Sequence, residues 1–361
     1  MLELQSMHRG EWAIVLLVAC STSPPVTPDS SIDLDAGDEP MRDAKVYPDT
    51  DPPLESGILV KGPDLLSQSG LYSDIGTRTL APGVTPFTPR WQLWSDGAEK
   101  KRWILLPQGK QIDTQNMDQW TFPVGTKLWK EFKVSTTVVE TRFLWKQGEG
   151  WPYWWMGAYR WRVDGTDAEY QKLGEPNALG TTHDVPSQVD CVRCHNGVVD
   201  VGIGFSAMQL SAPQNSQLAA FSAMGWFTNP PVKEYDAPGQ GTERDALTYF
   251  HSNCGHCHNE YSWLYTKQTQ MVLRLHVTDA TVQQTGAWAT VGYKMKHQGD
   301  PMWGDYAILA GKPNESQVWL RMNVRDKGLW QMPPVCTKVI DGPAVATIGS
   351  WITSLPPPPD M

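Results

Sequence analysis

Two short segments of this sequence hold a pair of cysteines two residues apart, followed directly by a histidine. They are Cys191-Val-Arg-Cys194-His195 and Cys254-Gly-His-Cys257-His258. This pattern is the attachment signature of a c-type haem. Two thiols so spaced can add to the two vinyl groups of one porphyrin, and the next imidazole can then bind its iron. The sequence therefore predicts two covalent haem c groups, attached through Cys191, Cys194, Cys254 and Cys257, with His195 and His258 as iron ligands.

A different chemistry uses the same cysteines. Two Cys-x-x-Cys pairs can form a four-cysteine zinc site or disulfides. A zinc ribbon does not require a histidine directly after each pair, so we favour haem. The chain has 6 cysteines; of the remaining two, Cys336 has no obvious partner and is expected to be a buried free thiol.

Composition limits the remaining classes. The chain has 361 residues and a formal net charge of -9, with no basic cluster, so nucleic acid is not an expected partner. Its length allows two or three domains. It contains 29 Pro, 31 Gly and 18 Trp, which fits a loop-rich exported protein whose tryptophans form the core or the walls of a haem site.

The first residues indicate export. Residues 1–20 contain an apolar run, Trp12 to Ala19, of signal-peptide length and too short to span a bilayer. Leu17-Val-Ala-Cys20 resembles a lipobox, which implies a lipid on Cys20, and Ser21 after it implies outer-membrane sorting. We expect a periplasmic outer-membrane lipoprotein, with a plain signal peptide as the alternative. Residues 21–56 are rich in Pro, Ser and Asp and are expected to be a disordered linker.

Residues 57–235 are expected to form a β domain that contains the first haem motif. Within the strand over 154–163, Tyr159, Trp161 and Val163 are expected to be buried, since they alternate with arginines. Glu131, Glu140 and Arg142 are interpreted as ordinary solvated residues. Strand-length runs separated by turn signals predict an antiparallel β-sandwich or barrel-like sheet; they are Lys101–Leu106, Thr126–Val134, Val138–Lys146 and Trp154–Val163.

Residues 236–361 are expected to form a second, mainly α domain, which makes the fold class α+β. Thr242-Glu-Arg-Asp245 fits a capping box that starts a helix leading into Cys254. Asp341, with Pro343 after it, is expected to cap a closing helix that ends near Leu355. The segments 271–277 and 287–293 have the character of strands.

Several short motifs carry a family resemblance that covers about residues 63–356. The sequence resembles a family of exported dihaem c-type cytochromes that is widespread in Gram-negative bacteria. A sheet that precedes a late haem motif is also similar, more weakly, to cytochrome P460. The resemblance implies a periplasm-facing electron carrier. The motifs include Leu71-Tyr-Ser-Asp, Gly83-Val-Thr-Pro-Phe87, Leu93-Trp-Ser-Asp-Gly-Ala98, Phe122-Pro-Val-Gly-Thr126 and Gly204-Phe-Ser-Ala207.

The order of helix, haem motif, methionine and final helix resembles a class I cytochrome c. That order implies Met332, in Trp330-Gln-Met-Pro-Pro334, as the second ligand of the second iron. A following proline can hold such a methionine in an extended backbone. His256, inside the attachment loop, is expected to point outward. The competing residues are Met295, Met302, Met322, His251, His276 and His297.

The sixth ligand of the first iron stays open between His183, Met208 and none. Two strong ligands would mean electron transfer alone, and we expect a periplasmic one-electron carrier that meets a redox partner protein, with no catalytic side chains. An open iron would instead permit a haem peroxidase or a gas-converting enzyme. A third alternative is a cytochrome subunit of a dehydrogenase.

Overall fold

The structure is a computed structural model that describes residues 60–195, 197–262, 264–265, 269–295, 304–325 and 330–356. These residues all belong to one compact unit. The expected signal peptide with Cys20, the expected linker, and the candidate ligands His297 and Met302 lie outside the described residues.

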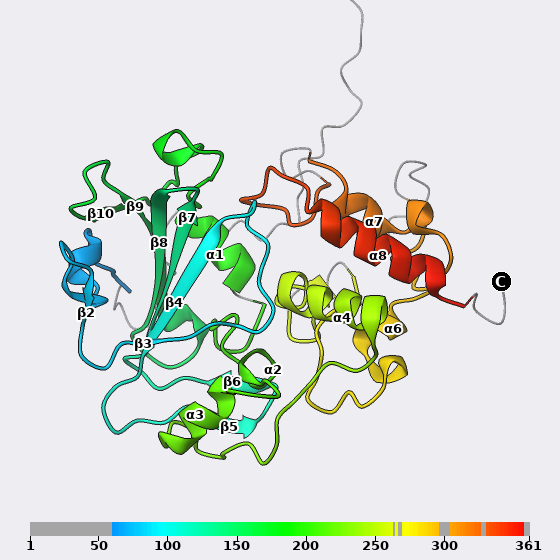
Figure 1. Ribbon diagram of the computed structural model, residues 1–361, viewed down its shortest axis with the longest axis horizontal. Coiled ribbons are helices and arrows are strands. Elements are labelled where there is room, and N and C mark those ends of the chain that lie inside the picture. The colour runs from blue at the N-terminus through cyan, green and yellow to red at the C-terminus, as the bar shows by residue number, and fades with distance from the viewer. Residues whose placement is uncertain are drawn as a thin grey trace, which may run out of the picture. The chain divides into compact units, whose positions relative to one another are not determined.

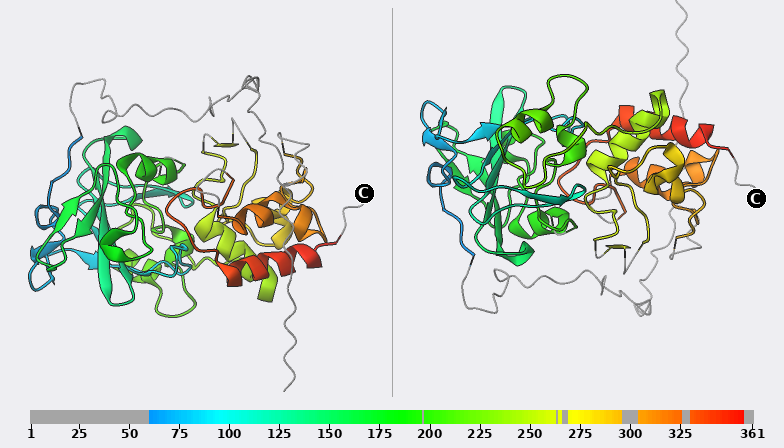
Figure 2. Two further views of the ribbon diagram at one scale, coloured as in Figure 1. Left: turned by 90° about the horizontal axis from the view of Figure 1, so that it is seen from above. Right: turned by 90° about the horizontal axis from the view of Figure 1, so that it is seen from below.

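A six-stranded antiparallel sheet is the largest element of the described chain (Figures 1 and 2). Its order is β10-β9-β8-β7-β4-β3, so the sheet is open and β10 and β3 form its edges. Two small sheets pair β1 with β2 and β5 with β6. The strands are β1 Tyr72–Asp74, β2 Thr79–Leu80, β3 Thr85–Pro86, β4 Glu99–Leu105, β5 Asp113–Asn116, β6 Gln119–Thr121, β7 Lys127–Val134, β8 Thr137–Lys146, β9 Trp154–Trp161 and β10 Ala168–Tyr170.

Short helices follow the sheet, and two longer ones, α4 and α8, pack on each other (Figure 1). The helices are α1 Gln188–His195, α2 Ala207–Leu210, α3 Gln217–Ala223, α4 Gly241–Asn253, α6 Gly286–Ala289, α7 Gln317–Met322 and α8 Gly342–Ser354. Short 3-10 turns lie at Leu66–Gln68, Trp151–Tyr153, Ala178–Gly180, Val282–Gln284 and Pro313–Glu315. The fold is therefore α+β with mainly antiparallel sheets, as the sequence predicts at this coarse level.

The two faces of the sheet differ in composition. On one face, the opposed side chains of Trp103, Trp129 and Phe143 form an aromatic row, and the last two rings stack with centroids 5.3 Å apart. This row packs against the chain from Val60 to Tyr72. On the other face, apolar residues such as Leu128 and Leu144 join the core shared with the helices, whereas the charged residues of that face line a cavity.

The four long strands agree with the sequence prediction to within two residues at each end. Their aromatic and branched side chains favour extended backbone, and turns end them. Gly125 and Gly165 adopt φ of 98° and 69°, which a glycine tolerates best. Val163 departs from the expected pattern: it is 91% exposed, because β9 ends at Trp161 and the turn has already begun.

Other expectations for local structure had mixed outcomes. α4 and α8 are confirmed, and Asp341 accepts a hydrogen bond from Ala344 N as the expected cap of α8. The capping box at Thr242 is wrong, because the N-cap of α4 is Gln240, two residues earlier, and Thr242 lies inside the helix. The strand at 271–277 is also wrong. Its backbone bonds instead to the segment of the second haem motif: Leu273 N donates to His258 O and Leu275 N to His251 Nδ1.

The strand expected at 287–293 is wrong as well. Residues 286–289 form α6, a short helix that Thr285 caps by accepting a hydrogen bond from Trp288 N. After the helix, Val291 makes a single isolated bridge to Ile308. The alternation of apolar residues here reflects burial in the core of the helical part and not pairing in a sheet.

Candidate functional site

The first haem motif forms the C-terminal half of α1. Ser187 and Asp190 start this helix in the manner of a capping box: Ser187 N donates to the Asp190 carboxylate, and Asp190 N donates to Ser187 Oγ. Cys191 is buried, while Cys194 and His195 are half-buried on the wall of a cavity. The helix therefore brings Cys194 and His195 to the cavity, while Cys191 lies behind them in the buried core.

One nitrogen of His195 is held by the backbone. Nδ1 lies 2.7 Å from the carbonyl oxygen of Val201. A carbonyl can only accept, so Nδ1 carries the proton and Nε2 keeps a free lone pair. Burial lowers the pKa of His195 to about 4, which keeps the ring neutral. A neutral imidazole with its other nitrogen fixed by a carbonyl is the state in which histidine binds iron.

A buried ion pair anchors the loop that carries Val201. Lys146, at the end of β8, is completely buried, and its Nζ lies 2.9 Å from Asp200 Oδ2. The same carboxylate accepts hydrogen bonds from Phe122 N, at 2.6 Å, and from Trp154 Nε1. Asp200 thus ties its loop to three strand segments and fixes the carbonyl that orients His195.

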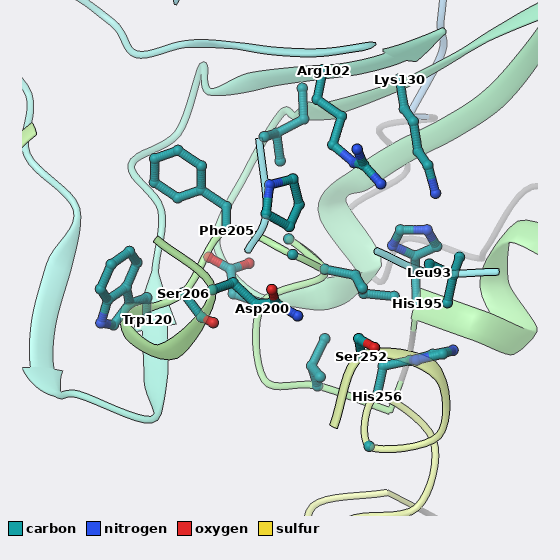
Figure 3. A pocket seen from close by; sticks show the side chains of 18 of the residues that line it. Leu93, Arg102, Trp120, Lys130, His195, Asp200, Phe205, Ser206, Ser252 and His256 are labelled. Atoms are coloured by element: carbon teal, nitrogen blue, oxygen red, sulfur yellow. The ribbon is translucent and has the colours of Figure 1, made fainter. Parts of the chain in front are cut away.

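The cavity beside His195 lies between the sheet and the segment around the second motif (Figure 3). Its sides combine aromatic rings with cations. The aromatic residues include Trp91, Trp120, Phe122 and Phe205. The second motif contributes Gly255 and His256, and α4 contributes His251 and Ser252.

Three cations form a row across the cavity face of the sheet. Arg102 of β4 is paired with Lys130 of β7, and Lys130 is paired with Arg142 of β8. Like charges placed directly opposite each other destabilise a sheet. Burial, with Arg102 and Arg142 nearby, lowers the pKa of Lys130 well below its usual value. Arg102 Nη1 is buried and has no hydrogen-bond partner among the described residues. We call these three residues the basic row; its charge suits an anionic ligand.

Glu140 and Arg142 are not the solvated residues that the sequence suggested. Glu140 is 0% exposed and accepts from Arg142 Nη2 at 2.6 Å, and the His183 Nε2 lies 2.9 Å from the same oxygen. Glu131 is likewise buried, with Tyr72 Oη 3.5 Å away. The error has a physical reason: charged residues in a strand predict a solvated face, but here other parts of the chain cover both faces of the sheet at these positions.

The second motif follows α4, whose C-cap is Cys254. His258 N donates to Cys254 O at 2.8 Å, which closes the attachment loop. Burial, and then the charge of Arg321, lower the pKa of His258 to about 4, so this ring is neutral too. Its Nδ1 is buried without a hydrogen-bond partner in the described chain.

The two motifs are in direct contact. Asn259 Nδ2 donates to Gly197 O at 2.8 Å and to Gly255 O at 2.9 Å, so one side chain bridges the segments after His195 and inside the second loop. A Cβ on Gly197 would lie 2.3 Å from His256 O, so this approach requires glycine. Cys257 Sγ lies 4.0 Å from Arg193 O.

Met332, the expected ligand of the second iron, is half-buried and bonded through its backbone to the end of α7. Its N donates to Arg321 O at 2.8 Å, and Arg321 is also the charge that acts on His258. Met322 is buried in the core, and Met295 packs against it. Met332 and His258 thus both neighbour Arg321.

The other candidate ligands have different surroundings. His183 is buried with its Nε2 at Glu140, and Met208 is buried in the core. His251 borders the cavity, but its Nδ1 accepts from Leu275 N at 3.0 Å. His276 Nε2 lies 2.9 Å from Glu260. His256 does not point outward as expected: it borders the cavity beside His195 (Figure 3).

The surroundings of the cysteines fit neutral sulfur. Burial raises the pKa of Cys191 and of Cys254 to about 12, and raises those of Cys194 and Cys257 as well. Across the ranges that the structure describes, no three His, Cys, Asp or Glu side chains gather to hold a metal ion, and Cys336 is a free, half-buried thiol.

Sequence reasoning missed four residues of this site: Arg102, Lys130, Lys146 and Asp200. One signal was present. A basic residue stands on the buried face of each of three apolar strands, two positions from a buried apolar residue. These residues are Arg102, Lys130 and Lys146. Asp200, five residues after His195, carried no such signal.

Comparison of the chain with protein-family models, curated proteins and solved structures found no match. A search of the described residues for a helix long and apolar enough to cross a bilayer also found none.

Proposed function

We propose that this chain is a dihaem c-type cytochrome, a one-electron carrier that works in the periplasm and exchanges electrons with a redox partner protein. One observation carries the proposal: two Cys-x-x-Cys-His segments contact each other through Asn259 and Gly197, and His195 offers a free Nε2 to a cavity. A relay needs its two redox centres close together, and adjacent attachment segments supply that proximity.

The cavity suits a haem in three respects. Its aromatic sides can pack on a flat porphyrin ring. The basic row can pair with the two propionate groups, which would relieve the repulsion between Arg102, Lys130 and Arg142 and give Arg102 Nη1 a partner. The Cys194 sulfur and the His195 imidazole lie on the same wall.

The arrangement of residues 236–361 supports a cytochrome c-like part. α4 leads into the second motif and packs on the closing helix α8, where the rings of Phe250 and Trp351 meet edge to face at 5.6 Å. Met332 lies between these helices in sequence and next to Arg321 in space. We propose it as the second ligand opposite His258.

The protein's residues set the properties of the bound groups. Each haem iron, when bound, supplies one-electron chemistry by changing between its ferric and ferrous states. His195 and His258 are kept neutral by burial and so can act as ligands. A thioether ligand such as Met332 raises a reduction potential relative to a second histidine. A lipid on Cys20 would hold the protein at the outer membrane.

The test is the mass and spectrum of the full chain made in a bacterial host that attaches haem c. The expected mass exceeds that of the polypeptide by two haems, and the reduced protein shows the absorption bands of covalently bound c-type haem. Changing Cys191 and Cys194 to Ser should remove one haem, and changing Cys254 and Cys257 should remove the other.

Cys336→Ser is the matched control, because this free cysteine lies outside both motifs. It should keep both haems. A mature wild-type protein with the bare polypeptide mass, or with zinc in place of haem, would refute the proposed function.

A further inference from the structure

This inference rests on the proposed function and concerns the second axial ligand of the first iron. Three imidazoles border the cavity: His195, His251 and His256. His195 belongs to the first attachment motif. In Figure 3 the side chain of His256 comes from a different segment than that of His195, and both border one pocket. His256 is the middle residue of the second attachment loop.

The position of His256 is fixed by its backbone. Its carbonyl oxygen accepts from Asn259 Nδ2 at 3.1 Å, the same amide that binds Gly197 O and Gly255 O. That carbonyl also occupies the space that a side chain at Gly197 would need. The second loop is therefore docked against the segment that leaves His195, which brings its central side chain to the first motif's cavity.

The His256 ring is uncommitted. Its Nδ1 is buried, and no described residue offers it a hydrogen bond. An unpaired polar atom in such a place is destabilising until a partner satisfies it. An imidazole is also the commonest metal ligand among side chains.

The other candidates are committed elsewhere. His251 Nδ1 accepts a hydrogen bond from Leu275 N, so in the neutral ring the proton sits on Nε2 and no lone pair remains there. His183 Nε2 is engaged with the buried Glu140 carboxylate. Met208 is enclosed in the core cluster.

We infer that His256 is the second axial ligand of the first haem iron, so that the attachment loop of one haem supplies a ligand to the other. The first haem would then be held by two histidines, from α1 and from the second loop. Bis-histidine ligation leaves no open coordination position, which favours electron transfer over peroxide or gas chemistry. It would also join the two haems through three residues of chain, from His256 to His258.

The test uses the full-length mature protein and the variants His256→Ala and His256→Met, after mass analysis has established two haems per chain. Electron paramagnetic resonance of the oxidised wild type should show two low-spin haems, one with bis-histidine character. In His256→Ala, about half of the haem should become high-spin when oxidised and should bind carbon monoxide when reduced. In His256→Met, all haem should stay low-spin, but the lower of the two midpoint potentials should rise.

His276→Gln is the control, because His276 pairs with Glu260. It should leave spectra and carbon monoxide binding unchanged. The inference is overturned if His256→Ala keeps both haems low-spin and inert to carbon monoxide, or if the wild type already binds carbon monoxide at one haem. These outcomes differ from the failure of the proposed function, in which mass analysis finds no covalent haem.

Discussion

Arg102 lies on the cavity wall with a buried guanidinium nitrogen and with Lys130 opposite it in the neighbouring strand. A cation that faces a redox centre favours the reduced state, which carries one positive charge fewer. Each unit charge about 10 Å away contributes on the order of 1–2 kcal/mol at an effective dielectric constant of about 20. The basic row is therefore expected to raise the potential of the first haem.

We expect Arg102→Gln to lower the midpoint potential of the first haem, as measured by a spectroelectrochemical titration of the two-haem protein. Lys101→Gln is the matched control, since Lys101 is the next residue of β4 but is exposed and opposite Glu131. In Lys101→Gln the midpoint potential of the first haem should stay at the wild-type value. An equal shift in both variants would mean that the basic row does not act on the haem.

The nature of the ligand at Met332 makes a second prediction for a single residue. Met332→His should lower the midpoint potential of the second haem, because imidazole stabilises ferric iron more than a thioether does. The same titration measures it, and the first haem should be unaffected. Met322→Leu, a change in the buried core, should move neither potential. An unchanged second potential in Met332→His would assign the ligand elsewhere.

At the scale of elements, the ends of β6, β8 and β9 converge on Asp200. The carboxylate binds Lys146, the backbone of Phe122 and the indole of Trp154, and Val201 beside it orients His195. The loop that carries Asp200 and Val201 is thus held in place by three strand ends of the sheets. This explains how an irregular segment can hold the His195 imidazole, the proposed iron ligand, in one orientation.

Asp200→Ala would take from the Lys146 ammonium its buried counter-ion and leave it the exposed carboxylate of Glu149. We expect a loss of about 3–5 kcal/mol in the free energy of unfolding, measured by denaturation in guanidinium chloride. Glu149→Gln is the control: Glu149 lies 3.5 Å from the same ammonium, but its side chain is 77% exposed, so the loss should stay below about 1 kcal/mol. Similar losses in both variants would contradict the anchoring role of Asp200.

The elements that could be predicted from the sequence are those that local residue types specify. The strands β4, β7, β8 and β9 are specified locally, by branched and aromatic side chains and by glycine turns, so they were predictable. The segment 271–277 carries the same residue types, yet its hydrogen bonds go to His251 and His258, which only the tertiary fold brings near. Strand propensity alone therefore cannot distinguish a segment that pairs in a sheet from one whose backbone bonds elsewhere.

The candidate site divides in the same way. The cysteines and histidines proposed for haem attachment could be picked out from the sequence because that chemistry requires a fixed local spacing. The basic row could not be predicted from the sequence, because it depends on strand register. Its members, Arg102, Lys130 and Arg142, lie opposite one another only when β4, β7 and β8 are paired. His256 was interpreted as outward-facing for a similar reason, since most residues that line the cavity it borders lie far from it in the sequence, between 87 and 209.

At the scale of the whole molecule, the contact between Gly197 and His256 joins the part of the chain built on the sheet to the part built on α4 and α8. Further hydrogen bonds cross the same boundary: Asn253 Oδ1 accepts from Trp94 N at 2.6 Å, and Arg274 Nη2 donates to Asp118 O at 2.7 Å. The two motifs are therefore held within one folded unit and do not depend on a chance encounter of two domains.

Gly197→Ala tests this contact. The added Cβ would meet the His256 carbonyl, and we expect a loss of about 1–3 kcal/mol in the free energy of unfolding from overpacking, measured by denaturation in guanidinium chloride. The control is Gly342→Ala at the start of α8, where a Cβ meets no atom within 4 Å. It should be neutral or slightly stabilising. An unchanged stability in Gly197→Ala would mean that the two segments separate readily.

The enclosure of Cys191 has a consequence for the proposed attachment of haem. Its side chain is 8% exposed, in a helix covered by the sheet, and the neighbouring loops lock together through Asn259. Any reagent or enzyme that modifies this sulfur needs access that the finished fold denies. Modification must then come first, on a chain that is still open, and folding would seal the product in place. The order of assembly is therefore built into the architecture.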